Sequence, residues 1–170
     1  MVRQGVKHME PQPKTSCYYL GKTYPIYAKV DPSIKKITIQ WDGDVIICTS
    51  PQEGEIDIAD ALQAFYIKCS RKLMEERLKL YQPQFKVKYK SFSIENHPTK
   101  WGSCSSKKHL TFHWNLIRFP LNAVDYVVIH ELCHLIHMNH DRSFWRLLGK
   151  IYPVYKEAMV ILGTEKTRDM

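Results

Sequence analysis

The chain has 170 residues, a net charge of +8, and 44% hydrophobic and 12% aromatic residues, which is enough apolar material for a folded core and argues against wholesale disorder. No stretch approaches about 18 consecutive apolar residues, and the N-terminus lacks the apolar segment of a signal peptide, which argues against a membrane span and against secretion. The five cysteines are irregularly spaced without a CxxC pair, a pattern that is typical of reduced thiols in a cytoplasmic protein.

We expect two parts along the chain. Residues 1–16, which include Pro11 and Pro13, are predicted to be a flexible leader, and residues 17–170 are predicted to form a single domain. The domain opens with three β segments, and the Asp-Gly pair at 42–43 predicts a hairpin between the last two. The segments are CYYLGKTYPIYAKV (17–30), KKITIQ (35–40) and DVIICT (44–49).

A long helix is predicted for residues 58–80, because apolar residues recur there at spacings of three and four. Asp57 is its expected N-cap, and Gln82-Pro83 ends the pattern. Two further strands follow, separated by a loop. The strands are KVKYKSFSIE (86–95) and HLTFHWNL (109–116), and the loop is NHPTKWGSCSSKKH (96–109).

Two helices complete the expected fold. The first covers residues 123–136 with Asn122 as its N-cap, and it is predicted to bury one apolar stripe and to leave its two histidines on the opposite side. The second covers residues 143–162, with a kink at Pro153 and a stop at Gly163.

The stretch HELCHLIHMNH (130–140) holds four histidines and one glutamate. His130 and His134 are four residues apart, so on a helix they stand on one face and can bind one zinc ion. Glu131 lies about 100° around the helix, where its carboxylate can serve as a general base. The pattern predicts a catalytic metal site, which needs a third protein ligand and an open position.

The third ligand is a choice among three residues. His137 shares the helix face, but on a straight helix it would lie about 10 Å along the axis from His130. We therefore expect the chain to leave the helix after the second histidine and to turn at residues 138–139, which brings His140 back toward the metal. His140 is the predicted ligand, and His137 and Glu157 remain alternatives.

Several neighbouring residues are given structural interpretations. In WGSCS, Gly102 is expected to adopt a backbone conformation that other residues avoid, and Ser103 and Ser105 are expected to bind turn amides. Cys133 is expected to be a small buried apolar residue, and Asp141 could orient a ligand imidazole.

Four segments together resemble the YgjP-like metallopeptidase family, which is related to the SprT-like and WLM zinc metalloproteases. The resemblance covers about Tyr18 to Leu162 and implies a zincin-like α+β domain, in which a small antiparallel sheet accompanies the HExxH helix and flanking helices. The segments are WGSCS (101–105), WNL (114–116), YVVIHELCHL (126–135) and NHDRSFW (139–145).

The resemblance also implies the roles of the site residues. One catalytic zinc ion would be held by His130, His134 and His140, and Glu131 would be catalytic. The strand at 110–116 would lie beside the active site, and an unpaired edge there could align an extended peptide.

The leading hypothesis is a zinc-dependent hydrolase, most simply a peptidase, that acts on a peptide or protein. One alternative is a metal-dependent nucleotide phosphoanhydride hydrolase. Another is a nucleic-acid-associated binding module with structural zinc, which would need a fourth ligand such as Cys104. The charge of +8 either faces solvent or favours nucleic acid or nucleotide contact through a basic surface, and no membrane partner is expected.

Overall fold

The computed structural model describes residues 16–42, 45–54 and 57–163, and the statements below concern these residues. The chain divides into two compact units, Met1–Phe65 and Tyr66–Met170, and each is described by itself. The predicted flexible leader lies outside the described residues except for Ser16, which begins the first strand. That residues 17–170 form a single domain stays a prediction, because two compact units can unfold together or separately.

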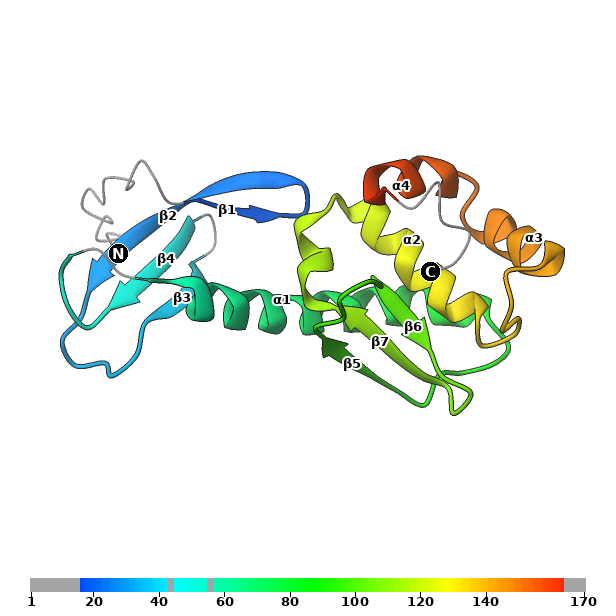
Figure 1. Ribbon diagram of the computed structural model, residues 1–170, viewed down its shortest axis with the longest axis horizontal. Helices are drawn as coiled ribbons and strands as arrows, with labels where there is room; N and C mark the ends of the chain where they lie inside the picture. The colour runs from blue at the N-terminus through cyan, green and yellow to red at the C-terminus, as the bar shows by residue number, and fades with distance from the viewer. Residues whose placement is uncertain (1–15, 43–44, 55–56, 164–170) are drawn as a thin grey trace, which may run out of the picture. The chain divides into compact units, whose positions relative to one another are not determined.

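The first unit contains a four-stranded sheet of β1 (Ser16–Tyr19), β2 (Lys22–Val30), β3 (Thr38–Asp42) and β4 (Val45–Ser50) (Figure 1). The strand order is β1-β2-β4-β3, and only the β2–β4 pair is parallel. Leu20 and Gly21 join β1 to β2 with positive φ values of 47° and 78°, as a two-residue hairpin turn requires. The β3–β4 hairpin is confirmed because Asp42 pairs with Val45, although its turn residues lie outside the described ones.

Side-chain alternation buries one face of this sheet. The buried residues on that face are Ile26, Ile39, Ile46 and Cys48. Three aromatic rings of the same unit contact one another with centroid distances of 4.8, 5.0 and 6.4 Å. This aromatic cluster consists of Tyr19, Tyr24 and Trp41.

Helix α1 (Ala59–Tyr81) contains the boundary between the two units and confirms the predicted long helix. Asp57 caps its start, because the Asp57 Oδ1 atom accepts a hydrogen bond from the Ala59 amide at 2.9 Å. Pro83 lies in the 3₁₀ turn η1 (Gln82–Gln84) that follows the helix. The residues that α1 buries in the second unit include Tyr66, Leu73, Met74 and Leu78.

The second unit contains a three-stranded sheet of β5 (Ser91–Glu95), β6 (Gly102–Cys104) and β7 (His109–His113). The strand order is β5-β7-β6, with β5 parallel and β6 antiparallel to β7. The chain reverses direction between β5 and β6 and again between β6 and β7. The first and third strands therefore run the same way and can pair in parallel.

Strand β5 is shorter than the predicted strand at 86–95, because its first half does not pair. The Gln82 side chain donates to the Val87 carbonyl at 3.0 Å and accepts from the Tyr89 amide at 3.2 Å. These side-chain bonds satisfy backbone groups that a strand would have paired with a neighbour, so the ladder begins only at Ser91.

Two other predictions in this region need correction. The loop predicted for residues 96–109 contains the short strand β6. The strand predicted for residues 109–116 ends at His113, and a 3₁₀ helix, η2 (Trp114–Arg118), follows. The change of structure coincides with a cap, because the His113 side chain accepts a hydrogen bond from the Asn115 amide at 3.0 Å.

Helix α2 (Leu121–Cys133) ends three residues before the predicted end. Its hydrogen bonds tighten to 3₁₀ spacing there, since the Leu135 amide donates to the Leu132 carbonyl and the Ile136 amide to the Cys133 carbonyl. The Asn122 side chain accepts from its neighbour's amide, but Pro120 and not Asn122 occupies the N-cap position.

The single helix predicted for residues 143–162 is two helices, α3 (Arg142–Ile151) and α4 (Tyr155–Leu162). Pro153 lacks the amide hydrogen that a continuous helix would need, and its ring clashes with the preceding turn, so it separates the helices instead of kinking one. Gly163 ends α4 with a φ of 67°, as predicted. Among the described residues, no helix combines the length and apolar character that crossing a membrane requires.

Within the second unit, α2 is tied to α1 by a partly buried ion pair. Arg77 Nε lies 2.6 Å from Asp125 Oδ1, and a second guanidinium nitrogen lies 2.8 Å from Oδ2. The Tyr81 hydroxyl also donates to Oδ2 at 2.9 Å. The last turns of α1 therefore hold the first half of α2 in place.

The predicted α+β class is confirmed. The prediction of an antiparallel sheet is correct only in part, because each of the two sheets contains one parallel pair. In both sheets the parallel neighbours are strands that are not consecutive in the chain.

Candidate metal centre

Helix α2 carries His130 and Glu131 in its last turn, and His134 is its C-cap. Every residue from 123 to 133 is buried, and His130, Glu131 and His134 are only 1%, 1% and 7% exposed. The predicted apolar stripe is buried, but the side of the helix that carries the histidines is buried as well, so burial is not confined to one stripe. Buried polar side chains need hydrogen-bond partners, and among the described residues the two imidazoles have them.

The structure brings the imidazoles of His130, His134 and His140 together. The His130 Nε2 atom lies 3.2 Å from His134 Nε2 and 2.9 Å from His140 Nε2. One ligand atom from each of the three residues lies within 4.8 Å of the others. Neither His137 nor Glu157 belongs to this group, so of the three candidates for a third ligand only His140 joins the histidines of α2.

The Nδ1 atoms of His130 and His134 lie close to neighbouring polar groups. His134 Nδ1 lies 2.9 Å from the His137 carbonyl oxygen, which can only accept, so Nδ1 carries the proton and Nε2 is left free of one. His130 Nδ1 lies 3.3 Å from the Tyr126 hydroxyl, one helical turn earlier. His137 thus takes part through its carbonyl oxygen, while its imidazole lies outside the histidine group.

The chain reaches His140 through a turn that α3 stabilises. The Trp145 indole donates to the His140 carbonyl at 3.1 Å. The Asp141 carboxylate accepts from the Ser143 and Phe144 amides at 2.8 and 2.9 Å and so caps α3. The suggestion that Asp141 orients a ligand imidazole is not supported by these bonds, because its carboxylate is used as the helix cap.

Phe144, in the first turn of α3, packs its apolar ring against all three imidazoles. Its ring centroid lies 4.8 Å from that of His130 and 4.7 Å from those of His134 and His140. Close packing on one side leaves the rings few alternative rotamers, so their Nε2 atoms are held in one arrangement before any ligand binds.

Strand β6 fixes the carboxylate of Glu131. A Cβ atom added at Gly102 would lie 2.8 Å from Glu131 Oε1 and 2.9 Å from its Cγ atom, which is closer than real contacts allow. Gly102 does not have a positive φ, so the expectation of an unusual backbone conformation is wrong. The glycine is required because the glutamate side chain passes directly over it.

Burial raises the pKa of Glu131 to about 8, an effect that the positive charge of Lys100 opposes. Its Oε2 atom is buried and has no hydrogen-bond partner among the described residues. An unpaired buried carboxylate oxygen is costly in a folded protein. This cost indicates that Oε2 forms its hydrogen bond with a group that is not part of the chain.

Two of the three imidazoles, those of His130 and His134, have lowered pKa values that favour the neutral form that metal binding needs. Burial lowers the pKa of His130 well below its ordinary value, and His134 and His140 add to this effect. Burial also lowers the pKa of His134. Three imidazoles with converging nitrogens, next in the chain to a glutamate whose Oε2 atom has no partner among the described residues, fit a Zn²⁺ ion that keeps one open coordination position.

The two cysteines near the site are poor nucleophiles and ligands. Burial, assisted by the negative charge of Glu131, raises the pKa of Cys133 to about 12 and that of Cys104 to about 11. Cys133 is fully buried, as expected for a small apolar residue.

The predictions for the residues that flank the site are correct in part. Ser105 accepts a hydrogen bond from the His109 amide at 3.2 Å, as expected of a residue that satisfies a turn. Ser103 instead pairs its hydroxyl with that of Thr111 on the neighbouring strand. Strand β7 is central in its sheet, so the prediction that residues 110–116 offer an unpaired edge is wrong. The edge strands are β5 and β6, and β6 contacts α2.

Residues 2–165 match the family model described as YgjP-like, metallopeptidase domain. A solved structure similar to this chain is described as the crystal structure of the metallopeptidase zymogen of Pyrococcus abyssi abylysin. The two are 26% identical with a TM-score of 0.45, and the match covers 59% of this chain and 97% of that one. None of the curated proteins matches the chain.

Proposed function

The chain belongs to the YgjP-like metallopeptidase family and is therefore a metal-dependent hydrolase, and we propose that it is a zinc peptidase in which Glu131 is the general base. The imidazoles of His130, His134 and His140 hold the zinc ion. The peptide or protein substrate reaches the position that the three histidines leave open.

One observation carries this proposal. Three imidazole nitrogens converge, and Glu131, which follows the first of these histidines in the chain, holds a buried carboxylate whose Oε2 atom has no partner among the described residues. When bound there, zinc would polarise the substrate carbonyl, acidify water and favour the anionic form of the nearby carboxylate.

The protein's own part in the reaction falls to Glu131. Its Oε2 atom is the acceptor for the proton of the attacking water, because that oxygen has no other bond to make. The same carboxyl then returns the proton to the leaving amine as the peptide bond breaks. The contact with Gly102 keeps the carboxyl from rotating away between the two transfers.

The ligand set favours catalysis over a structural zinc site. Structural zinc normally has four protein ligands, whereas the candidate group in the described part of the chain has three and does not include Cys104. The family favours a peptide over a nucleotide as the substrate. We therefore prefer the peptidase to the nucleotide hydrolase and to the binding module.

Strand β6 is the element best placed to align a substrate. It pairs with β7 along one side, with Gly102 opposite Phe112 and Cys104 opposite Leu110, and its other side faces no described strand. An extended peptide that added to this free edge would pass beside Glu131, since Gly102 touches that side chain.

The test is hydrolysis of a peptide mixture by the zinc-loaded protein, followed by mass spectrometry. We expect cleavage that a chelator abolishes and added zinc restores. Glu131→Gln should keep about one zinc ion per chain and lose about 10²- to 10⁴-fold in turnover, because the proton acceptor is gone while the ligands remain.

Glu157→Gln is the matched control, since it removes an exposed carboxylate of α4 that lies outside the histidine group. It should retain both zinc and turnover. Undiminished hydrolysis by Glu131→Gln, or hydrolysis that persists after zinc is removed, would overturn the assignment.

A further inference from the structure

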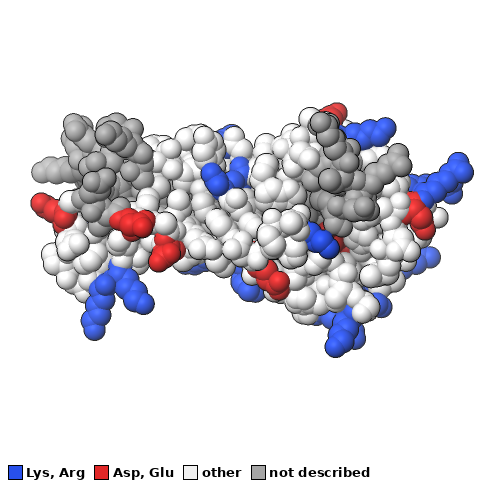
Figure 2. Space-filling view, viewed as in Figure 1, with Lys and Arg blue, Asp and Glu red and all other residues white. Residues whose placement is uncertain are grey.

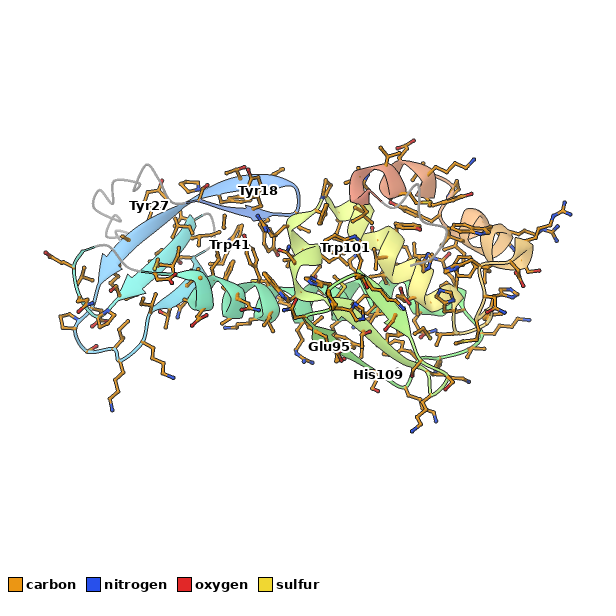
Figure 3. All side chains as sticks on the ribbon, in the orientation of Figure 1. Tyr18, Tyr27, Trp41, Glu95, Trp101 and His109 are labelled. Atoms are coloured by element: carbon orange, nitrogen blue, oxygen red, sulfur yellow. The ribbon has the colours of Figure 1, made fainter. Side chains whose placement is uncertain are left out.

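A small pocket lies beside the metal centre on the three-stranded sheet. It holds about 190 Å³ of empty space, part of which is open to solvent. Figure 3 labels Glu95, at the end of β5, and Trp101, immediately before β6. The pocket is lined by Glu95, His97, Lys100, Gly102, Ser103, Thr111, Phe112 and His113.

The pocket lies next to Glu131, the candidate catalytic residue. Gly102 lines the pocket, and the same residue is in contact with the carboxyl group of Glu131. A substrate whose scissile bond lay next to Glu131 would therefore have a neighbouring side chain or terminus within reach of the pocket.

Lys100 is the cationic side chain of the lining. The residue is exposed, and it has no salt-bridge partner among the described residues. Its charge reaches the metal centre, because it opposes the rise that burial causes in the pKa of Glu131 and adds to the fall that burial causes in the pKa of His134. An ammonium group without a carboxylate partner is available to an anionic ligand.

Two imidazoles add hydrogen-bond donors to the same lining. His97 Nδ1 accepts from the Thr99 amide at 3.2 Å, and His113 Nδ1 accepts from the Asn115 amide at 3.0 Å. In a neutral imidazole the proton must then lie on Nε2, so each ring has one N–H to offer. The lining thus combines one ammonium group with two ring donors.

Glu95 is the acidic residue of the lining, and it already has a partner. The Ser93 hydroxyl donates to Glu95 Oε1 at 2.5 Å. The hydroxyls of Ser103 and Thr111 are also paired with each other. The donors that remain for a ligand therefore belong to Lys100 and to the two histidines.

We propose that this pocket is a specificity subsite in which Lys100 binds a carboxylate of the peptide substrate close to the scissile bond. The carboxylate belongs either to an Asp or Glu side chain or to the free C-terminus of the peptide, since both present the same chemistry to an ammonium group and N–H donors. The subsite rests on the proposed peptidase function and adds a preference for acidic peptides to it.

The test measures binding apart from cleavage, with fluorescently labelled peptides and the zinc-loaded Glu131→Gln protein. Three six-residue peptides are compared. The first has Glu on both sides of the central bond and an amidated C-terminus, the second has Gln at the same positions and the same amide, and the third has Gln and a free C-terminus.

We expect one of the two acidic peptides to bind about tenfold more tightly than the neutral one, the size of a single charge-assisted hydrogen bond. Tighter binding of the first peptide identifies the side chain as the source of the carboxylate, and tighter binding of the third identifies the terminus. Adding Lys100→Gln should bring all three affinities within about twofold, and Lys100→Glu should reverse the preference.

Lys107→Gln is the matched control, because it removes an exposed charge from the β6–β7 turn and does not line the pocket. The tenfold preference should survive in this variant. Equal affinity for the three peptides, no binding of any of them, or a preference that survives Lys100→Gln would each overturn the subsite.

Hydrolysis of the same peptides by the wild-type protein separates the two proposals. If the acidic peptide binds preferentially but none is cleaved, the peptidase assignment fails and the carboxylate site stands. If all three peptides are cleaved at equal rates with equal affinities, the peptidase stands and the carboxylate site is wrong.

Discussion

The four-stranded sheet of the first unit and the three-stranded sheet of the second differ in the side chains that they leave partly exposed. The first presents the aromatic cluster, whose rings pack on one another. The second presents the His109 imidazole of β7, which bonds to two serine hydroxyls of β5, and the Glu95 carboxylate, which accepts from one of them. Strand alternation is common to both, so the pattern that builds a sheet says little about whether the sheet carries chemistry.

The two units also differ in net charge. Residues 66–170 hold 18 Lys and Arg against 9 Asp and Glu, whereas residues 1–65 hold 7 against 8, so the positive charge of the chain belongs to the unit with the histidines. On the face drawn in Figure 2, blue side chains project from the part of the molecule that holds α3 and the β6–β7 turn. Such a field draws anionic partners toward the site. Contact with nucleic acid or a nucleotide stays a prediction.

The largest expected effect tests whether His140 is the third metal ligand in the second unit. His140→Ala should weaken zinc affinity by more than about 100-fold, because a ligand matters more than the groups that orient it. His137→Ala should stay within about threefold, since only the backbone carbonyl of that residue bonds to the site. Zinc competition against a chelator measures both affinities. Equal losses in the two variants would contradict the three-histidine site.

The next effect concerns the stability of the metal-free protein. Folding raises the pKa of Glu131 from 4.5 to about 8, so the folded chain holds this proton more tightly than the unfolded chain. The stability that results is fully present below pH 4.5 and is lost as the pH rises through 8. Glu131→Gln removes that loss, and the metal-free variant should exceed the wild type by several kcal/mol at about pH 9. Parallel stability curves from pH 4 to 9 would contradict this.

Gly102→Ala separates the role of the Glu131 carboxyl from zinc binding, because the substitution lies in β6 and leaves the three histidines unchanged. The added methyl group must displace the Glu131 carboxyl, so turnover should fall about 100-fold while zinc content stays the same. Gly149→Ala is the control, since a Cβ atom there would meet Tyr155 at an ordinary 3.5 Å. Full activity in Gly102→Ala would mean that the carboxyl can act from another position.

A change in the first unit should affect stability alone. Trp41→Ala removes the ring that contacts both Tyr19 and Tyr24, and we expect a loss of about 2 kcal/mol in the free energy of unfolding. Val30→Ala, at the exposed end of β2, should cost less than about 0.5 kcal/mol. Urea unfolding gives both values. A large change in the zinc affinity of Trp41→Ala would contradict the expectation that the first unit affects stability alone.

The smallest effect concerns the hydroxyl behind His130. Tyr126→Phe removes the group that lies 3.3 Å from His130 Nδ1, and zinc affinity should fall about tenfold while the fold is retained. Tyr152→Phe is the matched control, because that hydroxyl donates to the Asn122 carbonyl and touches no imidazole. Equal zinc affinities in the two variants would show that the Tyr126 hydroxyl has no orienting role.

The sequence predicts the contribution of α2 to the site well, because the spacing of His130 and His134 is a local property of a helix. The return of the chain to His140 also follows from geometry, since a straight helix cannot bring a third histidine to the same metal. The assignment of these residues as ligands, and of Glu131 as the base, stays a prediction until metal is measured.

Strand β6 could not be predicted in the same way. It has three residues, lies in a segment rich in serine and lysine, and exists only because β7 pairs with it. The signal that could have found it is the isolated Gly102, since a glycine inside a strand often marks the close approach of another group. That the approaching group is Glu131 is a non-local fact, which periodicity does not contain.

The ion pair between Arg77 and Asp125 bears on how the protein could be shortened. A fragment that began at β5 would keep all three histidines and Glu131, yet it would lose the guanidinium and the Tyr81 hydroxyl that satisfy Asp125. It would also lose Met74 and Leu78, which are completely buried, and an uncompensated carboxylate would remain at the start of α2. A minimal catalytic fragment must therefore begin within α1, before Tyr66, even though no residue of α1 belongs to the histidine group.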